Sequence, residues 1–261
     1  MNRFDDSVLI LKNSTISGNS AKGSNTGGGG VFSFGAVTMT NSTISGNRAI
    51  TGGGGIFGGS LKISNSTISG NSTPGFAGGV GGSEVTVTNS TISGNKAGEE
   101  GGGVRLSGFP ATITNSTITR NSAARGGGLF SQSYATVTLN KTLISGNSAA
   151  SGREVSEYGG STVTANNFNV FGFNRNAGVS GFTLGATDIV PRVGLAKVLN
   201  TTLANNGGRT RTHALPTASP AIDSVSDGTC PPPARDQRGT RRPRDGNGDG
   251  GAACDTGSFE R

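Results

Sequence analysis

The sequence is poor in charged and aromatic residues and has no long apolar stretch. Of its 261 residues, 14% are charged and 5% are aromatic, with no tryptophan, one histidine and two cysteines. No segment approaches the apolar length of a membrane helix, so a transmembrane span is not expected. A disordered chain is not expected either, because aliphatic residues alternate with polar ones through most of the sequence.

The basic residues do not form a recognisable nucleic-acid site. The net charge is +7, and the densest basic run, which begins at Arg235, contains Asp236 and is followed by Asp245 and Asp249. A nucleic-acid surface would need aromatic stacking partners or a known reading element, and neither is close in the sequence. A nucleic-acid partner is therefore not expected.

Glycine and repetition are what the sequence has in excess. It contains 47 glycines and a seven-residue box, NSTISGN, whose copies lie 24 to 28 residues apart. Such a period is typical of stacked solenoid repeats. Intact boxes begin at Asn13, Asn41, Asn65 and Asn89, and altered ones at Asn115 (NSTITRN), Lys141 (KTLISGN) and Asn167 (NFNVFGF).

Each repeat has the same three parts in the same order: a glycine run that ends in an aliphatic residue, an alternating segment such as VTVT at Val85, and the box. The alternation predicts strands with one buried face. No part of the repeat is long enough for a crossover helix, so the chain is expected to wind as a parallel β-helix. We predict about seven coils, each rising about 4.8 Å.

Stacked coils place equivalent residues above one another, so the boxes predict two inward ladders of asparagine amides. The aliphatic residues predict columns, one of which runs from Ile16 to Ile144 and ends at Val170. The first ladder comprises Asn19, Asn47, Asn71, Asn95, Asn121 and Asn147, and the second Asn13, Asn41, Asn65, Asn89 and Asn115.

Two parts of the sequence resemble known families. The pairing of three glycines and an aliphatic residue, as at Gly28 to Val31, with Ile44 and Asn47 is similar to the polymorphic outer membrane protein repeat. The C-terminal segments resemble the ending of bacterial β-helix proteins of the choice-of-anchor Q type. Those segments are ANNGGRTRTHALPTASPAID from Ala204, DQRGTRRP from Asp236 and CDTGSFE from Cys254.

The resemblance implies an all-β, right-handed parallel β-helix of the pectin-lyase-like kind, exported to the bacterial surface or the extracellular medium. Residues 1–185 would form the repeats and residues 186–261 a small irregular module. No signal peptide precedes the repeats and no cap is visible, so we expect the chain to be the C-terminal part of a longer product.

The module contains three candidate sites. Cys230 and Cys254 are expected to form a disulfide in an exported protein, and free thiols are the alternative. Asp245, Asn247 and Asp249 alternate as in a calcium loop, although an Asx turn explains the same pattern, so calcium is the one cofactor considered. His213 is expected to be a packed, hydrogen-bonded residue rather than a catalytic base.

No catalytic residues are predicted. Parallel β-helices include polysaccharide lyases and hydrolases, but the acidic residues of the coils do not converge on one strand face when the repeats are aligned. Glu99, Glu154 and Asp245 would be the candidates if the chain were an enzyme. The acidic residues of the coils are Asp5, Asp6, Glu84, Glu99, Glu100, Glu154 and Glu157.

The sequence therefore predicts a non-catalytic, monomeric β-helix that acts as a stalk or as an adhesin-like binder of a glycan or a surface. A polysaccharide-degrading enzyme is the first alternative. The second is an ice-binding face, because threonines repeat outward at two positions of the alternating segment. Those threonines are Thr38, Thr86, Thr112, Thr138 and Thr164, and Thr40, Thr88 and Thr114.

Overall fold

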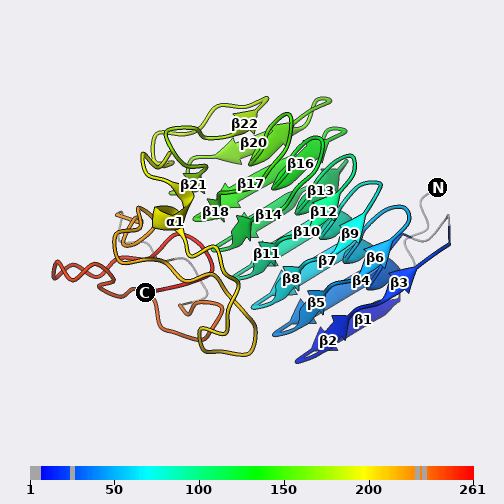
Figure 1. The fold of residues 1–261 in the computed structure, drawn as a ribbon, viewed down its shortest axis with the longest axis horizontal. Helices are drawn as coiled ribbons and strands as arrows, with labels where there is room; N and C mark the ends of the chain where they lie inside the picture. Colours follow the sequence, from blue (N-terminus) through cyan, green and yellow to red (C-terminus); the bar gives the residue numbers. More distant parts are fainter. Residues whose placement is uncertain (1–6, 24–26, 227–229, 231–233) are drawn as a thin grey trace.

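Residues 7–23, 27–226, 230 and 234–261 are described by the computed structural model. Most of the chain winds into a parallel β-helix in which three sheets run along the axis, and a C-terminal segment lies against one side (Figure 1). The seven-stranded sheet receives one strand from each coil, which confirms the predicted number of coils.

The three sheets differ in strand length. The eleven-stranded sheet contains β1 (Val8–Lys12), β4 (Val31–Thr40), β7 (Ile56–Ser64), β10 (Val80–Thr88), β13 (Val104–Ser107), β14 (Ala111–Thr114), β16 (Leu129–Gln132), β17 (Thr136–Asn140), β19 (Val155–Glu157), β20 (Thr162–Ala165) and β22 (Val179–Ser180). The seven-stranded sheet contains β2 (Thr15–Ser17), β5 (Thr43–Ser45), β8 (Thr67–Ser69), β11 (Thr91–Ser93), β15 (Thr117–Thr119), β18 (Leu143–Ile144) and β21 (Val170–Phe171). The four-stranded sheet contains β3 (Ser20–Ala21), β6 (Arg48–Ala49), β9 (Ser72–Thr73) and β12 (Lys96–Ala97).

The aliphatic columns stack in register along the axis. Met39 pairs with Ile63 and Ile63 with Val87, so the alternating segments bury one continuous face, as predicted. The end of the isoleucine column was predicted wrongly. Ile144 pairs with Phe171, and Val170 instead pairs with Leu143 on the outer side. One extra residue between Ala165 and Phe168 causes this shift, because Ala165 pairs with Leu139, 26 residues earlier, whereas Phe168 takes the left-handed conformation of Lys141, 27 residues earlier.

The first asparagine ladder runs through the interior at one corner. In each rung the backbone N–H and the side-chain Nδ2 both donate to Oδ1 of the next asparagine, at 2.9–3.0 Å. The second hydrogen of Nδ2 is donated to the carbonyl of an isoleucine in the preceding coil, as in the bond from Asn95 Nδ2 to Ile68 O at 3.0 Å. Each amide after that of Asn19 therefore links three coils. This ladder satisfies buried polar groups that a sharp turn would otherwise leave unpaired.

The second asparagine ladder was placed wrongly. Asn41, Asn65 and their equivalents have φ of 46–50° and occupy the left-handed corner position, which asparagine tolerates better than most residues. The residue after each one points inward instead. Backbone N–H groups of Ser42 and Ser66 donate to the hydroxyl of the next serine at 3.1 and 3.2 Å.

Both polar ladders end on a carboxylate. Asn147 donates from its backbone N and Nδ2 to Oε2 of Glu154, at 3.1 and 2.6 Å. The inner ladder of serine hydroxyls ends in the same way at later coils. Thr142 N donates to Asn169 Oδ1, and Asn169 donates from its backbone N and its Nδ2 to Asp188 Oδ1 at 3.1 and 2.9 Å. Each carboxylate thus accepts the bonds that the next rung would otherwise accept.

The glycine runs let neighbouring coils approach closely. A Cβ on Gly103 would lie 2.5 Å from the carbonyl oxygen of Gly128 and 2.9 Å from Nδ2 of Asn121. Gly79 meets the same pair of obstacles one coil earlier, from Gly103 O and Asn95 Nδ2. These glycines are therefore required by packing against both the next coil and the asparagine ladder.

Gly103→Ala is expected to lower the free energy of unfolding by about 3 kcal/mol, because neither the backbone carbonyl nor the ladder amide can move without breaking other bonds. Gly75→Ala is the matched control, since its nearest neighbour atom would be 3.5 Å from the new Cβ. We expect that control to stay within about 0.5 kcal/mol of the parent protein. Urea unfolding followed by circular dichroism measures both, and equal effects would contradict the packing argument.

From residue 186 onward the chain has little regular structure. Its helix, α1 (Leu195–Val198), has four residues, and short bridges such as Ala204 with Thr212 replace extended strands. This C-terminal module lies along the outside of the seven-stranded sheet (Figure 1). A second apolar cluster joins Leu143 and Val170 of the coils to Leu215 and Phe259 of the module. Across the part of the chain that the structure describes, no helix has the length and apolar character needed to span a membrane.

Candidate functional site

The outer face of the seven-stranded sheet carries two columns of hydroxyl side chains, because threonine and serine occupy the outward positions of each TIS strand. On the later coils these hydroxyls bond the module. Thr91 Oγ1 donates to Gln237 Oε1 at 2.7 Å, and Thr117 Oγ1 lies 3.0 Å from Ser258 Oγ. The outward threonines and serines of the repeated box thus form the surface against which the module packs.

Gln237 joins the module to two successive coils. Its Nε2 lies 3.0 Å from Thr67 Oγ1 and 2.9 Å from Thr210 Oγ1, and both hydroxyls are acceptors for it. Thr67 in turn donates to the carbonyl of Arg211 at 2.6 Å. Since Gln237 is 4% exposed, these bonds are shielded from water and fix the loop that contains Thr210 against β8.

His213 is buried between the module and β11, as expected for a packed residue. Nδ1 lies 2.7 Å from the carbonyl oxygen of Asn200, so Nδ1 carries the proton, and Nε2 accepts from Ser93 Oγ at 2.8 Å. Ser93 and His213 are 4% and 1% exposed, which leaves no room for a substrate at this serine–histidine pair. Burial lowers the pKa of His213 to about 4.

The lowered pKa of His213 predicts acid sensitivity. Folding favours the neutral imidazole, so stability is present above pH 6.5 and is lost as pH falls towards 4, by about 3 kcal/mol in total. His213→Asn should be less stable than the parent protein at pH 7, and the difference should shrink by roughly this amount at pH 4. Urea unfolding at several pH values tests this, and a constant difference would contradict it.

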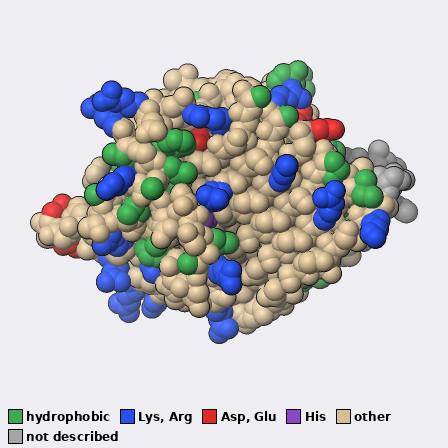
Figure 2. Space-filling model, in the orientation of Figure 1, with side chains coloured by type: hydrophobic (Ala, Val, Ile, Leu, Met, Phe, Trp, Pro, Cys, Tyr) green, Lys and Arg blue, Asp and Glu red, His purple; other side chains and the backbone are tan. Residues whose placement is uncertain are grey.

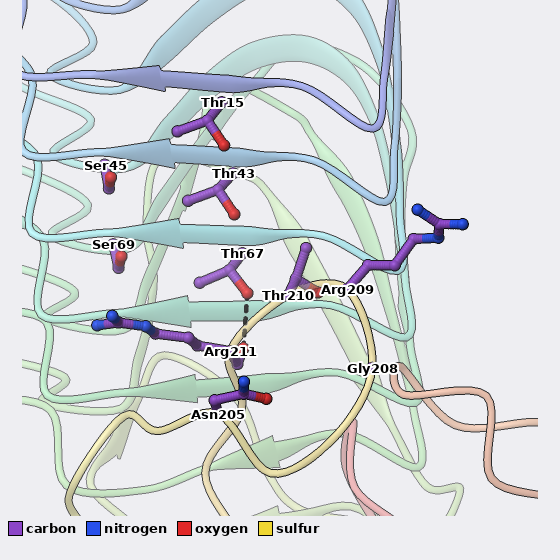
Figure 3. Close-up of a pocket in the computed structure, with 10 residues that line it drawn as sticks. All are labelled: Thr15, Thr43, Ser45, Thr67, Ser69, Asn205, Gly208, Arg209, Thr210 and Arg211. Carbon is purple, nitrogen blue, oxygen red and sulfur yellow. Dashed lines mark hydrogen bonds between the residues drawn. The ribbon is translucent and has the colours of Figure 1, made fainter.

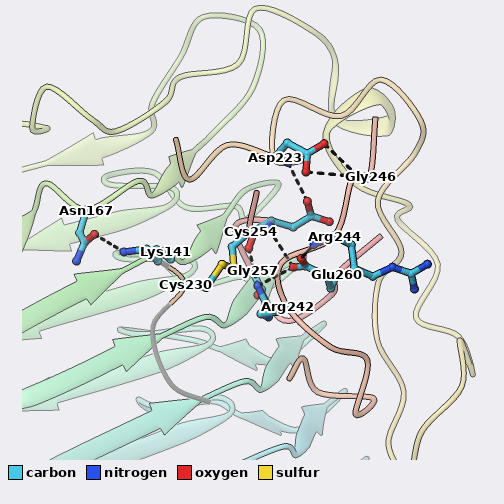
Figure 4. Close-up of a disulfide and its surroundings, with 11 residues drawn as sticks. Lys141, Asn167, Asp223, Cys230, Arg242, Arg244, Gly246, Cys254, Gly257 and Glu260 are labelled. Carbon is cyan, nitrogen blue, oxygen red and sulfur yellow. Dashed lines mark hydrogen bonds and ion pairs between the residues drawn. A yellow bond between two sulfur atoms is a disulfide. The ribbon is translucent and has the colours of Figure 1, made fainter. Parts of the chain in front are cut away.

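The module encloses a cluster of buried charges beside its disulfide (Figure 4). Arg242 donates to the carbonyls of Asp255 and Gly257, both at 2.6 Å, and pairs with Glu260 at 3.1 Å. Burial raises the pKa of Glu260 to about 8 and that of Asp255 to about 6, and Arg242 opposes both shifts. Cys230 and Cys254 form the disulfide, with Cα atoms 5.7 Å apart.

The aspartate-rich loop is held by its own backbone. Asp245 accepts from the N–H groups of Gly248 and Gly250 at 2.6 and 3.0 Å, and Asn247 accepts from Asp249 N at 2.8 Å. The bond from Asp249 N to Asn247 is that of an Asx turn, and Asp245 closes the loop over a longer span. Among the described residues, no group of three or more His, Cys, Asp or Glu side chains is placed to hold a metal ion. Calcium binding by Asp245, Asn247 and Asp249 stays a prediction.

Most acidic residues of the coils that the structure describes have structural partners. Glu154 is fully buried and accepts from Asn147 and from Gly146 N at 2.9 Å, and burial raises its pKa to about 7 against these bonds. Glu157 accepts from Val163 N at 2.7 Å. Glu84, in β10, and Glu99, just after β12, are exposed at different places on one coil. Asp5 and Asp6 lie outside the described residues.

One carboxylate lies on an outer face with two arginines. Glu100 Oε2 is 3.3 Å from Arg105 Nε, and its other oxygen pairs with Arg125. Arg105 lies over the ring of Phe76, 4.4 Å from its centroid, and Arg125 lies near Phe130 and Tyr158. A single neutralised carboxylate within an aromatic stripe lacks the second acid that glycoside hydrolysis needs.

The outward threonines of the eleven-stranded sheet stack in register. Thr86 pairs with Thr112 and Thr112 with Thr138, and the neighbouring column contains Thr88 and Thr114. Lys62 occupies the first column beside Thr86. The threonine face therefore exists as an array with a lysine within it.

A polar groove lies on the first coils, at the edge of the part of the seven-stranded sheet that the module covers (Figure 3). Its volume is about 460 Å³; β2, β5 and β8 form its floor and the loop around Thr210 its wall. The complete lining is Thr15, Thr43, Ser45, Thr67, Ser69, Asn205, Gly208, Arg209, Thr210 and Arg211. A second groove of about 310 Å³ shares Arg209 and extends past Asn41, Asn65 and Asn89 towards Arg235 and Arg238.

The comparison with family models agrees with this architecture. Residues 3–168 match the model described as the right handed beta helix region. The chain belongs to this family. No curated protein matches this β-helix chain, and no solved structure does. The match ends before β21 and β22, so the last strands, the module and both grooves are known from the structure described above.

Sequence reasoning missed the residues that form the grooves of this right-handed β-helix. The sequence does contain a signal for these residues. Threonine and serine recur at outward positions of the box, where packing of the core does not require a hydroxyl group. The NGGRTRTH segment was used only for its family resemblance. Its alternation of arginine and threonine places Thr210 against the coils and turns Arg209 and Arg211 outward, as Figure 3 shows.

Proposed function

We propose that this chain is a non-catalytic β-helix that is exported from a bacterial cell and binds a glycan at a surface, either as an adhesin or as part of a stalk. The observation that supports this most directly is that several carboxylates of the chain are already bonded to other groups of the protein. Glu154 and Asp188 end the ladders, and Glu100 is paired with two arginines. The accessible polar groups that line the two grooves beside the module are hydroxyls, amides and guanidinium groups, which suit sugar binding.

The disulfide between Cys230 and Cys254 supports export, because such bonds persist in oxidising compartments. The fully paired coils also suit a rigid spacer, since each coil is hydrogen-bonded to both neighbours. We further propose that the β-helix works as a monomer, with no nucleic-acid partner.

The proposal is tested by incubating the purified, disulfide-intact protein with neutral and acidic polysaccharides, with and without calcium. Bound protein and newly formed chain ends are both measured. Binding without new ends is the expected result. New chain ends above those of a heat-inactivated sample would overturn it, and their loss in Glu100→Gln would favour the alternative of a polysaccharide lyase or hydrolase, because Glu100 is the carboxylate that lies beside basic side chains.

The second alternative is an ice-binding face, which the registered columns of Thr86, Thr112 and Thr138 favour. Shaping of ice crystals by the protein, and its loss in Thr88→Tyr, would support that alternative. Unaltered crystals would leave glycan binding as the proposal.

A further inference from the structure

The hydroxyl columns of the seven-stranded sheet are satisfied on some coils and open on others. Beyond β8 the module supplies partners: Gln237 and Ser258 for the threonine column, and His213 for Ser93. Among the described residues, the side-chain hydroxyls of Thr15, Thr43, Ser45 and Ser69 have no hydrogen-bond partner. The open part of the columns is the floor of the groove in Figure 3.

The open hydroxyls form a regular array. Thr15 pairs in register with Thr43, and Thr43 with Thr67, so equivalent hydroxyls repeat about every 4.8 Å along the axis. A polymer with regularly repeated hydroxyl or acidic groups can contact several of these positions at once. The module already shows that this face binds polar partners through amide and hydroxyl groups.

The walls of the groove are basic. Arg209 and Arg211 are exposed, and within the described ranges neither side chain has a hydrogen bond or an ion pair. Thr210 between them is anchored by donating to Asn65 O at 3.1 Å, so the loop holds the two guanidinium groups on opposite sides. On the face drawn in Figure 2, Lys and Arg are spread over a mostly uncharged surface with few acidic groups.

Within the described parts of the chain, the two grooves have one carboxylate, and it is already occupied. Asp236 is 2% exposed; its Oδ1 accepts from the N–H groups of Arg238 and Thr240, and its Oδ2 accepts from Arg238 Nε and Glu260 N. Arg235 adds a third exposed guanidinium at the far end of the second groove. The combined channel is therefore positive, and guanidinium groups bind carboxylate and sulfate oxygens in pairs.

We propose that this channel binds an extended anionic polysaccharide, with the arginines on its carboxylate or sulfate groups and the threonine and serine columns on its hydroxyls. The inference rests on the proposed glycan-binding function and assigns its site and ligand charge. A nucleic acid is the weaker occupant, because none of the described residues that line the two grooves has an aromatic side chain to stack on a base.

The test is a binding titration in EDTA with polygalacturonate, dextran sulfate and neutral dextran, using the full chain. Arg209→Gln/Arg211→Gln should bind the anionic polymers about tenfold more weakly. Arg175→Gln/Arg192→Gln is the control, because it removes the same charge from exposed side chains at a different cavity and should bind as the parent does. Thr43→Val, which keeps the charge, should weaken binding several-fold.

The outcomes separate this inference from the proposed function. Binding of the parent protein to polygalacturonate or dextran sulfate that both double variants retain would overturn the channel but leave glycan binding standing. Equal losses of binding in both double variants would mean that net charge alone causes the effect, which would overturn the inference. Tighter binding of DNA than of either anionic polymer would make nucleic acid the ligand and would also overturn it. Preference for neutral dextran, or no binding, overturns it too. Cleavage with weaker binding by Arg209→Gln/Arg211→Gln would overturn only the non-catalytic function.

Discussion

Replacing Asn95 by alanine is expected to lower the free energy of unfolding by about 4 kcal/mol, one of the two largest effects that we predict. The side chain accepts from the N and Nδ2 of Asn71 and donates to Ile68 O and to Asn121 Oδ1, all at 2.9–3.0 Å. Alanine would leave two buried donors and a carbonyl unpaired, and each such group costs about 1–3 kcal/mol. Urea unfolding at neutral pH measures the effect.

Asn19→Ala is the matched control, because Asn19 belongs to the same ladder but is exposed and only donates, to Asn47 Oδ1. We expect it to cost about 1 kcal/mol or less. Asn95→Asp adds a second check. The aspartate cannot donate to Ile68 O when ionised, so folding raises the pKa of this carboxyl, and the variant should recover stability as the pH falls towards the ordinary range of a carboxyl group. If Asn95→Ala and Asn19→Ala have equal effects, the ladder is not a buried network.

Arg242→Met is the second large effect, with an expected loss of about 3–5 kcal/mol from the module. Methionine keeps much of the apolar volume but leaves the carbonyls of Asp255 and Gly257 without this donor and Glu260 without its buried cation. Limited proteolysis and thermal unfolding should show the module opening before the coils, because the ladders lie outside this cluster.

The pH dependence identifies the cause of that loss. The pKa of Glu260 is already raised to about 8, so its contribution is present below about pH 4.5 and is lost as the pH rises through 8. Removing Arg242, which lowers this pKa, should make the deficit of Arg242→Met larger at pH 8 than at pH 5. Arg244→Met is the control, since Arg244 is exposed and bonds Glu260 through its backbone N–H. A deficit independent of pH would mean that lost packing is the cause.

The coils could be predicted from the sequence because their determinants are local and repeated. Alternation within each segment sets the buried face, and the period sets the partner, so pairs such as Ile63 with Val87 follow from alignment alone. The two errors have local causes as well. The corner asparagines are selected by their left-handed backbone rather than by an inward amide ladder, and the residue inserted before Phe168 was hidden by an altered box.

The site was much harder to predict, because its contacts join distant segments. Thr91 meets Gln237 across 146 residues, and Thr67 meets Arg211 across 144. A polar side chain in an irregular segment carries no period that reveals its partner. The sequence indicated a disulfide and a family-like ending. Tertiary packing decides which face of the coils the module covers and at which coil that contact ends.

The two carboxylates at the ladder ends give the solenoid a direction. In every rung one amide donates to the next, and an amide continues the stack because it both accepts and donates, whereas Glu154 and Asp188 only accept from the ladders. The two carboxylates therefore end the amide ladders, although β19 to β22 continue the coils after Glu154. Whole repeats inserted before Glu154 should extend the asparagine ladder, so these two side chains act as terminators of the amide stack rather than of the coils.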